Sequence, residues 1–435
     1  MRYYSTNHIS PDVTVGETVV KGLAPDNGLY MPERINPLAD DEIARLPEMD
    51  FREIGRTVAR RLFDGDIPRD ALDEIADGTL TFDTPVREVM TGVWSLELFH
   101  GPTLAFKDVG ARFMARMLRH FLKDDPRTIH VLVATSGDTG SAVANGFLGV
   151  EGIKVHVLYP KGKVSPIQEC QFTTLGQNVT TIEVDGTFDD CQRLVKTAFL
   201  DSGLNSRMLL TSANSINVAR LFPQTFYYFN AWAQLRRAGV RGPVVFSVPS
   251  GNFGNLTAGL IARKMGLRDI RFIAANNAND IFLEYLRTGA YNPRPSVQTI
   301  ANAMDVGDPS NFRRILDLFG GNHEAICNLI SGAAYTDDEI AATMRECYGT
   351  AGYIADPHGA CALRALAEGK RPGETGVFLE TAHPAKFKDT VDGILGTDIE
   401  IPARLRAFME GTKSSVAMTA RYEAFEAYLK GIAEQ

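Results

Sequence analysis

The chain has 435 residues, of which 44% are hydrophobic and 23% are charged, the balance of a globular protein with a full core. Its net charge of −8 argues against a nucleic-acid-binding protein, because such proteins normally carry a basic face. No apolar run reaches the length of a membrane span, and the start MRYYSTNHIS lacks the apolar stretch of a secretion signal, so we expect a cytoplasmic protein.

The five cysteines are scattered along the chain, and no two of them form a Cys-x-x-Cys pair. Their spacing therefore predicts neither a disulfide framework nor a zinc site, and we expect no bound metal. A reducing compartment suits this cysteine usage.

Residues 1–92 differ in pattern from the rest of the chain. Their first part contains the turn-rich stretch GLAPDNGLYMPE, and amphipathic segments such as FREIGRTVARRLF follow. We interpret this region as a smaller N-terminal domain.

Beyond residue 92, short apolar runs rich in β-branched residues alternate with helical patterns. The pattern predicts strands at 129–134, 153–158, 179–184, 244–249, 270–275 and 376–380, and helices at 189–201, 217–239, 256–266 and within 400–435. The aromatic residues between 222 and 232 are predicted to form the buried side of a helix. This alternation predicts an α/β protein with two doubly wound, mostly parallel-sheet domains, over 93–240 and 241–435.

The stretch HGPTLAFKDVG, residues 100–110, places Lys107 between Phe106 and Asp108. Apolar surroundings or a cationic partner can free a lysine amine to react with an aldehyde. Most lysines are solvated surface charges, and the neighbours of Lys107 alone leave that alternative open.

The loop TSGDTG, residues 135–140, follows a predicted strand and precedes a helical pattern. The hydroxyl groups of Thr135, Ser136 and Thr139 add donors that suit a carboxylate. Asp138 would repel such an anion, and its alternative role is to cap the following helix.

The loop SGNFGN, residues 250–255, occupies the same kind of position after the strand at 244–249. Gly251 and Gly254 allow the backbone to turn its N–H groups inward, and the helix that follows adds positive potential, so the loop predicts a phosphate site. It is neither a Walker loop nor the Gly-x-Gly-x-x-Gly dinucleotide motif. By itself the loop is equally compatible with a glycine-rich turn that binds nothing.

A reactive lysine and two anion-binding loops are together the parts that pyridoxal phosphate needs. The lysine meets the aldehyde, one loop takes the 5′-phosphate, and the other takes the carboxylate of the substrate.

Seven motifs follow one another along the chain: HGPTLAFKD, ATSGDTG, YPKGKVSP, SANSINVARL, PSGNFGN, NAMDVG and TAHPAKF. This series resembles that of the bacterial and fungal threonine synthases, which are pyridoxal-phosphate enzymes of the tryptophan synthase β-like fold (fold type II). The resemblance extends from STNHIS near the N-terminus to beyond residue 390, and APDNGLYMPE resembles the N-terminal domain of that family.

The resemblance implies that Lys107 holds the cofactor covalently and acts as the catalytic residue. The cofactor phosphate would bind to Ser250, Gly251, Asn252, Phe253, Gly254 and Asn255. Thr381 would place its hydroxyl at the pyridine nitrogen, where it holds a proton less firmly than an aspartate would. Asp138 is a candidate partner of the cofactor O3′, although many relatives in the wider fold carry Asn there, and Asn214 is the alternative.

The implied reaction converts O-phospho-L-homoserine and water to L-threonine and phosphate. The candidate substrate-binding residues are Thr103, Thr135, Ser136, Thr139, Lys161, Lys163, Ser165, Asn214, Asn217 and Arg220. Arg220 is favoured for the substrate phosphate over the lysines, because it lies in an uncharged polar stretch and guanidinium can bind phosphate through two parallel hydrogen bonds.

Two alternatives stay open from the sequence. One is a related pyridoxal-phosphate enzyme that eliminates a different group, such as a serine dehydratase or a phospho-lyase, and the other is a metabolite-binding protein without activity. The N-terminal region and HGPTLAFKD favour the threonine synthase interpretation. We expect a small-molecule substrate, no nucleic-acid or membrane partner, and a monomer or homodimer.

Overall fold

The computed structural model describes residues 1–433 and divides the chain into two compact units. Unit 1 consists of Met1, residues 31–106 and residues 221–400, and unit 2 consists of residues 2–30, residues 107–220 and the stretch that begins at Ile401. This division interleaves the two units along the chain, because the C-terminal stretch returns to unit 2. It cuts the chain differently from the consecutive segments 1–92, 93–240 and 241–435, which remain a prediction.

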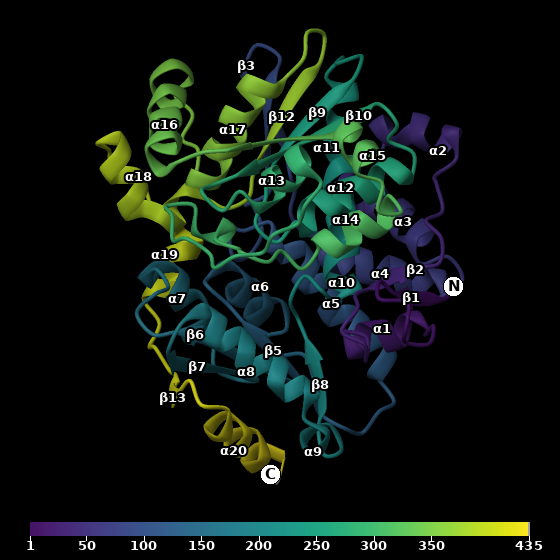
Figure 1. The fold of residues 1–435 in the computed structure, drawn as a ribbon, viewed down its shortest axis with the longest axis vertical. Coiled ribbons are helices and arrows are strands. Elements are labelled where there is room, and N and C mark those ends of the chain that lie inside the picture. Colours follow the sequence, from purple (N-terminus) through teal and green to yellow (C-terminus); the bar gives the residue numbers. More distant parts are fainter. Residues whose placement is uncertain (434–435) are drawn as a thin grey trace. The chain divides into compact units, whose positions relative to one another are not determined.

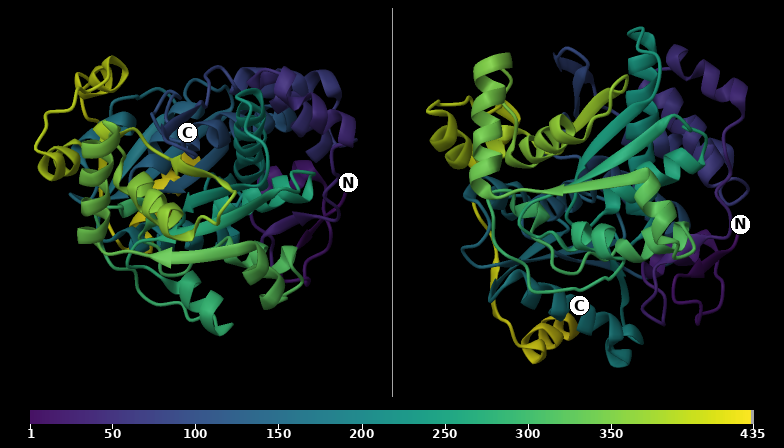
Figure 2. Two further views of the ribbon diagram at one scale, coloured as in Figure 1. Left: turned by 90° about the horizontal axis from the view of Figure 1, so that it is seen from above. Right: turned by 45° about the horizontal axis from the view of Figure 1, so that its top comes forward.

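Unit 1 is built on a six-stranded sheet in the order β11-β10-β9-β12-β4-β3. Its strands are β3 (Val86–Met90), β4 (Val93–Glu97), β9 (Val244–Pro249), β10 (Ile270–Asn276), β11 (Ile330–Ala334) and β12 (Thr375–Glu380). All neighbours pair in parallel except β3, which runs antiparallel to β4 at the edge. β10, β9 and β12 are neighbours in this sheet (Figure 1), and Figure 2 shows the same ribbon from two further directions.

The first helical segments of unit 1 are α2 (Asp40–Arg45), η1 (Leu46–Glu48), α3 (Phe51–Leu62), α4 (Arg69–Thr79), η2 (Phe222–Gln224), α11 (Thr225–Arg237) and α12 (Gly254–Lys264). The later ones are α13 (Ile281–Thr288), η3 (Asn302–Met304), α14 (Phe312–Leu318), α15 (His323–Leu329), α16 (Asp337–Ala351), α17 (Pro357–Gly369), η4 (Pro384–Phe387) and α18 (Lys388–Leu395).

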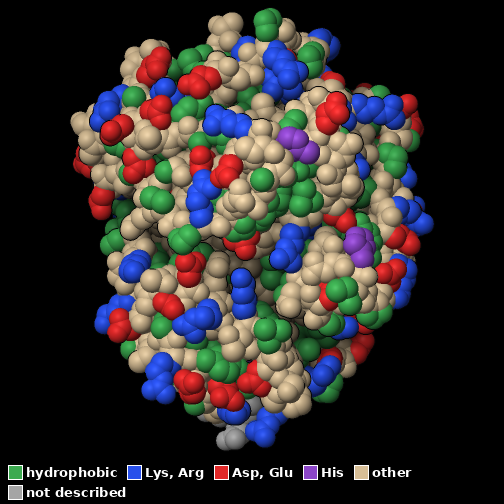
Figure 3. Space-filling model, viewed as in Figure 1, with side chains coloured by type: hydrophobic (Ala, Val, Ile, Leu, Met, Phe, Trp, Pro, Cys, Tyr) green, Lys and Arg blue, Asp and Glu red, His purple; other side chains and the backbone are tan. Residues whose placement is uncertain are grey.

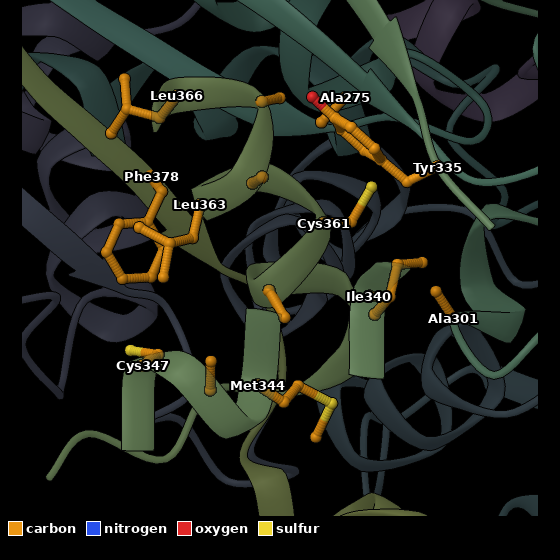
Figure 4. Packing of buried hydrophobic residues seen from close by; sticks show 14 of the residues in the cluster. Ala275, Ala301, Tyr335, Ile340, Met344, Cys347, Cys361, Leu363, Leu366 and Phe378 are labelled. Carbon is orange, nitrogen blue, oxygen red and sulfur yellow. The ribbon is translucent and has the colours of Figure 1, made fainter. Parts of the chain in front are cut away.

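Helix α17 fixes the core on one side of this sheet, since it packs against β9, β10 and β12. Figure 4 shows side chains of α16 and α17, among them Met344 and Cys361, gathered with Phe378 of β12. All seven residues of β10 are buried, which is typical of a parallel strand covered on both faces.

Unit 2 contains a second sheet, which has five strands in the order β13-β7-β6-β5-β8, all parallel. These are β5 (Ile129–Ala134), β6 (Ile153–Pro160), β7 (Val179–Asp185), β8 (Leu209–Ser212) and β13 (Val416–Thr419), and the short β1 (Tyr3–Ser5) lies outside the sheet. The helices are α1 (Val15–Lys21), α5 (Lys107–Leu122), α6 (Asp138–Gly146), α7 (Pro166–Thr173), α8 (Phe188–Leu200), α9 (Ser202–Asn205), α19 (Ala403–Met409) and α20 (Tyr422–Ala433). Two short elements, β2 (Tyr30–Pro32) and α10 (Val218–Leu221), each include a change of unit.

The predicted fold class is confirmed, because each unit has a mostly parallel sheet with helices packed on it. All six predicted strands are present, with ends that shift by two residues at most. The single helix predicted over 217–239 is wrong: the segment divides into α10, η2 and α11. Pro223 lies at the break, and proline removes a backbone donor from a helix interior.

The surface mixes charges of both signs, as expected for a chain with a small net charge. On the face shown in Figure 3, Lys and Arg side chains alternate with Asp and Glu. None of the helices in the described part of the chain is both long and apolar enough to cross a membrane.

Candidate active-site residues

In unit 1, the predicted cofactor residues follow two neighbouring strands. The register pairs Phe378 of β12 with Ser247 of β9, so Thr381 and Ser250 leave adjacent parallel strands at the same level. The carboxyl edge of a parallel sheet is where ligands of such folds bind. The structure therefore brings the 250–255 loop and Thr381 together.

The 250–255 loop turns at Phe253 and not at its glycines. Phe253 has φ of 59°, in the left-handed region, and lies immediately before α12, whereas Gly251 and Gly254 do not have positive φ. Gly251 is required for another reason: a Cβ there would come within 2.7 Å of the Met304 Cα. The sequence expectation that the glycines make the turn is therefore wrong, and Gly251 serves a close approach of two backbones.

Residues far away in sequence hold this loop. The Ser250 N–H donates to the Ala275 carbonyl at 2.8 Å, and the Asn276 side chain donates to the Ser250 carbonyl at 2.9 Å. Asn252 accepts the Ser310 N–H through its Oδ1 at 2.6 Å. The sequence offered no signal for these partners, because they belong to other strands and loops.

Asn255 has one buried polar atom without a partner. It lies in the first turn of α12, and its Oδ1 accepts the Tyr228 hydroxyl, whereas its Nδ2 makes no hydrogen bond within the described residues. Burial raises the pKa of Tyr228 well above its ordinary value, so the phenol stays protonated and can donate. A buried N–H without an acceptor costs about 1–3 kcal/mol unless a ligand satisfies it.

The first turn of α12 also presents N–H groups that have no acceptor within the helix, at its positive end. Together with the Asn255 Nδ2, these donors fit a bound phosphate, so the residues of the loop are suited to the 5′-phosphate of pyridoxal phosphate.

Thr381 follows β12 directly and is 7% exposed. Its carbonyl accepts the Phe106 N–H at 2.9 Å, and its hydroxyl makes no hydrogen bond to any described residue. The Tyr227 hydroxyl donates to the Phe106 carbonyl, so both the backbone N–H and the backbone carbonyl of Phe106 are hydrogen-bonded. Lys107 is the next residue along the chain.

The aromatic cluster was predicted as core, and residues 226–229 are indeed buried. That prediction missed the polar ends of Tyr227 and Tyr228, whose hydroxyl groups bind the Phe106 carbonyl and the Asn255 side chain. A tyrosine in a run of aromatics gives no signal of the partner of its hydroxyl.

In unit 2, Lys107 is the first residue of α5 and is half-buried. Asp108 beside it is buried, whereas the aspartates of surface segments are usually exposed. Thr103, four residues earlier and in unit 1, is also buried, and its carbonyl accepts the buried Lys386 ammonium at 3.0 Å.

The 135–140 loop joins β5 to α6 and uses Thr135 internally. The Thr135 Oγ1 accepts the N–H groups of Gly137 at 2.9 Å and Gly140 at 2.8 Å, so these two amides already have an acceptor. Ser136 and Thr139 are half-buried.

Asp138 does not cap α6. The capping position belongs to Gly137, and Asp138 is the first helical residue. Its Oδ1 accepts the Gln168 side-chain amide at 2.9 Å, and Asp138 is 5% exposed. The capping interpretation is therefore wrong, because the carboxylate is directed to another helix.

The other predicted substrate residues follow β6 and β8, the two strands that flank β5. Lys161 and Lys163 are exposed, Ser165 caps α7 through the Gln168 N–H at 3.2 Å, and Asn214 is half-buried. Since the strands are parallel, all these residues lie at the same edge of the sheet.

Asn217 and Arg220 are both buried. The Asn217 side chain donates to the Val19 carbonyl at 2.9 Å and accepts the Ala219 N–H at 3.0 Å, so its amide is used within the protein. Arg220 is 3% exposed, and its Nη1 donates to the Ala213 carbonyl.

Comparison with known proteins first defines the class. A family model described as "Pyridoxal-phosphate dependent enzyme" matches residues 81–379, which include Lys107, both loops and all of β12 except its last residue, Glu380. The chain is therefore a pyridoxal-phosphate-dependent enzyme. Models described as "Threonine synthase N terminus" and "Threonine synthase, C-terminal" match residues 2–80 and 358–429.

Full-length relatives then define the family. The chain is 45% identical to threonine synthase of Haemophilus influenzae, with 99% of each chain covered, and 46% identical to that of Escherichia coli, with 93% and 94% covered. Crystal structures of threonine synthase from Escherichia coli and of the pyridoxal-phosphate-bound enzyme from Brucella melitensis each superpose with a TM-score of 0.93, at 42% and 34% identity. The first match covers 99% of this chain and 100% of the other, and the second covers 100% of both. The chain belongs to the threonine synthase family.

Proposed function

We propose that the protein converts O-phospho-L-homoserine and water to L-threonine and phosphate in the cytoplasm, as a monomer or homodimer without nucleic-acid or membrane partners. Relatives named threonine synthase that align along 99% of the chain support this activity. The observation that carries it comes from the 250–255 loop. The buried Asn255 Nδ2 in this loop is a hydrogen-bond donor that has no acceptor among the described residues.

Pyridoxal phosphate supplies an electron sink for charge that develops at the substrate α-carbon. We assign its phosphate to Ser250, Gly251, Asn252, Phe253, Gly254 and Asn255. Thr381 would meet the pyridine nitrogen through its hydroxyl, and Lys107 would hold the cofactor covalently. Asp138 remains a candidate for the O3′, although its Oδ1 already accepts a hydrogen bond from Gln168, and Asn214 remains the alternative.

Lys107 has two proton-transfer roles in this proposal. Its Nζ would take the proton from the α-carbon of the substrate and would later remove a proton from the β-carbon. The γ-phosphate would leave with its bridging oxygen, and the γ-carbon would take up a proton to become the methyl group of threonine. Water would add its hydroxyl at the β-carbon, and the α-carbon would regain a proton. Lys107 is the only residue assigned to the chemistry itself.

The remaining residues bind and orient the substrate. Its carboxylate is assigned to the 135–140 loop through Ser136 and Thr139, with Thr135 shaping the loop. Its phosphate is assigned to Lys161, Lys163, Ser165, Asn214 and Arg220. The side-chain amide of Asn217, the other residue predicted there, already has partners within the protein, so Asn217 would act through the position of its neighbours. Thr103 is retained as a substrate contact from the loop before Lys107.

The test is to incubate the purified holoenzyme with O-phospho-L-homoserine and to measure threonine and phosphate together. We expect equal amounts of both products, and no turnover by Lys107→Ala at the same cofactor concentration. Release of ammonia and an oxo acid from serine or phosphoserine, without threonine, would instead identify a related enzyme with a different leaving group.

A further inference from the structure

Two buried carboxyl groups and an imidazole lie behind the cofactor residues of unit 1. Asp356 precedes α17, His358 lies in its first turn, and Glu380 ends β12; each is at most 1% exposed. The helix lies directly on Glu380, because a Cβ at Gly359 would come within 2.1 Å of the Glu380 Oε1. None of these three residues has a part in the activity proposed above.

The hydrogen bonds of His358 indicate which of its ring nitrogens donates and which accepts. The Ala303 N–H donates to the His358 Nε2 at 3.2 Å, so this nitrogen carries no proton. The His358 Nδ1 therefore bears the hydrogen and donates it to the Asp356 Oδ1 at 2.5 Å. Asp356 therefore acts as the acceptor of the ring N–H.

The two carboxyl groups lie together, and each has an oxygen that lacks a donor. The Asp356 N–H donates to the Glu380 Oε2 at 3.2 Å, which brings the groups together. The second oxygens, Asp356 Oδ2 and Glu380 Oε1, are both buried and have no donor within the described residues. A proton on Glu380 that is directed to Asp356 satisfies both oxygens, and it avoids two buried negative charges side by side.

The pKa of Glu380 agrees with a proton on this residue. Burial, and next the nearby Asp356, raise the pKa of the Glu380 carboxyl well above its ordinary range. The Asp356 Oδ1 accepts both the backbone N–H of His358 at 2.7 Å and the N–H of its ring. Glu380 is thus a neutral donor.

The network reaches both parts of the candidate cofactor site. At one end, Glu380 directly precedes Thr381, and the Glu380 carbonyl accepts the Leu98 N–H at 2.9 Å. At the other end, His358 holds Ala303 of η3, and the next residue, Met304, is the one against which Gly251 packs. Ala301, beside η3, belongs to the same hydrophobic core as Cys361 of α17 (Figure 4).

We propose that protonated Glu380, Asp356 and His358 are positioning residues that hold Thr381 and the 250–255 loop in a fixed relation, so that one cofactor molecule can bind to both. This inference rests on the proposed placement of the cofactor phosphate in that loop. The three residues act through their neighbours and touch no reacting atom.

The proton is tested by two substitutions of Glu380 in the full-length apoenzyme. Glu380→Gln keeps a donor toward Asp356 and an acceptor for its N–H, so we expect the melting temperature to stay close to that of the wild type. Glu380→Met has a similar size but neither group, and we expect a clear decrease. A decrease as large for Glu380→Gln as for Glu380→Met would overturn the assignment of the proton.

The positioning role is tested by titrating the same apoenzymes with pyridoxal phosphate, at a temperature where all are folded. We expect an affinity within about twofold of the wild type for Glu380→Gln and at least tenfold weaker for Glu380→Met. The ³¹P resonance of the bound cofactor should shift only in Glu380→Met. If Glu380→Met lowers the melting temperature but leaves affinity and ³¹P shift unchanged, the network is merely structural and the proposal fails.

His358 gives an independent comparison should Glu380→Met not fold. His358→Gln can still offer an acceptor to the Ala303 N–H, whereas His358→Leu cannot, so only the latter should weaken cofactor binding by tenfold or more. The control is His323→Gln, which alters another imidazole bonded to a backbone group in unit 1. Gly254→Asp separates the two hypotheses: unchanged cofactor affinity in that variant contradicts the proposed phosphate site, while the melting temperatures still report the proton.

Discussion

Two buried asparagines, Asn217 and Asn255, use their side-chain amides in different ways. Asn217 is buried with its amide nitrogen bonded to the Val19 carbonyl, which makes it part of the internal structure of unit 2. Asn255 is buried with its amide nitrogen free of any acceptor in the described chain. Since a native protein rarely leaves such a donor unsatisfied, the difference supports the proposed assignment of Asn255 to the cofactor phosphate.

Asn255→Asp should weaken the binding of pyridoxal phosphate by about ten- to a hundredfold. The change removes a hydrogen bond to an anion, which contributes about 1.5–3 kcal/mol, and it adds a negative charge beside the phosphate. Tyr228 can still donate to the new carboxylate, so the fold should be retained.

Cofactor titration of the apoenzyme measures this effect. Asn322→Asp is the matched control, because Asn322 is the N-cap of another helix of unit 1, α15. Its side-chain oxygen accepts the Ala325 N–H, and aspartate has an equivalent oxygen. Equal affinities for both variants and the wild type would place the phosphate elsewhere.

Arg220→Ala should reduce kcat/KM for O-phospho-L-homoserine by about ten- to a hundredfold or more, because a bidentate guanidinium–phosphate contact contributes roughly 1.5–3 kcal/mol. The visible spectrum of the bound cofactor should stay intact. The burial of Arg220 makes a melting curve a necessary control, since a lost side chain also leaves a cavity.

Two other results for Arg220→Ala would exclude the assigned role. Loss of the cofactor absorbance would make Arg220 structural or cofactor-facing. Full activity would assign the substrate phosphate to Lys161 and Lys163, which are exposed at the same sheet edge.

At the level of elements, the turn after β9 depends on the approach of η3. Gly251→Ala should destabilise unit 1 by about 1–3 kcal/mol, because the new Cβ would meet two backbone atoms, the Met304 Cα at 2.7 Å and the Ala303 oxygen at 2.8 Å. The same displacement should weaken cofactor binding.

Urea unfolding with a cofactor titration checks this expectation. Gly393→Ala in α18 is the control: no atom lies within 4 Å of its added Cβ, and alanine in a helix interior should stabilise by roughly 0.5–1 kcal/mol. A Gly251→Ala variant as stable as the wild type would show that η3 can move freely.

Strands β5 and β6 carry a pair of buried histidines. The His130 Nδ1 and His156 Nε2 lie 3.1 Å apart, and the rings stack at 5.3 Å. Burial lowers the pKa of His130 to about 4 and of His156 to about 3, with Lys154 adding to both shifts. Both imidazoles are therefore neutral in the folded protein at neutral pH.

Stability should consequently fall as the pH decreases from about 6.5 toward 4, because the unfolded chain binds protons there that the folded chain does not. Each histidine contributes up to about 1.4 kcal/mol per pH unit. The slope of the unfolding free energy against pH should decrease in His156→Gln and stay the same in His8→Gln, an exposed position. Equal slopes in all three proteins would contradict neutral buried imidazoles.

For the molecule as a whole, the sequence predicts the α/β class, the predicted strands and the loops at their carboxyl ends, because these depend on local patterns. It does not predict β13, since the segment VAMT is short and mostly exposed and is a strand only through its pairing with β7. Nor does it predict that Phe425 and Leu429 of the C-terminal helix complete the core of unit 2.

Some residues of the candidate site can likewise be predicted from the sequence, and others cannot. Lys107 and the 250–255 loop can be found from the sequence, because a lysine in an apolar setting and a glycine-rich strand end are local signals. The roles of Tyr228, Ala303 and Met304 depend on contacts between residues distant along the chain, which no local pattern encodes.

The most direct test of the proposed activity is to run the reaction in water labelled with ¹⁸O and to analyse both products by mass spectrometry. If the carbon–oxygen bond of the substrate breaks and water adds at the β-carbon, the label appears in the hydroxyl group of threonine and not in the released phosphate. Label in the phosphate, with homoserine as the other product, would show phosphorus–oxygen cleavage and contradict the account.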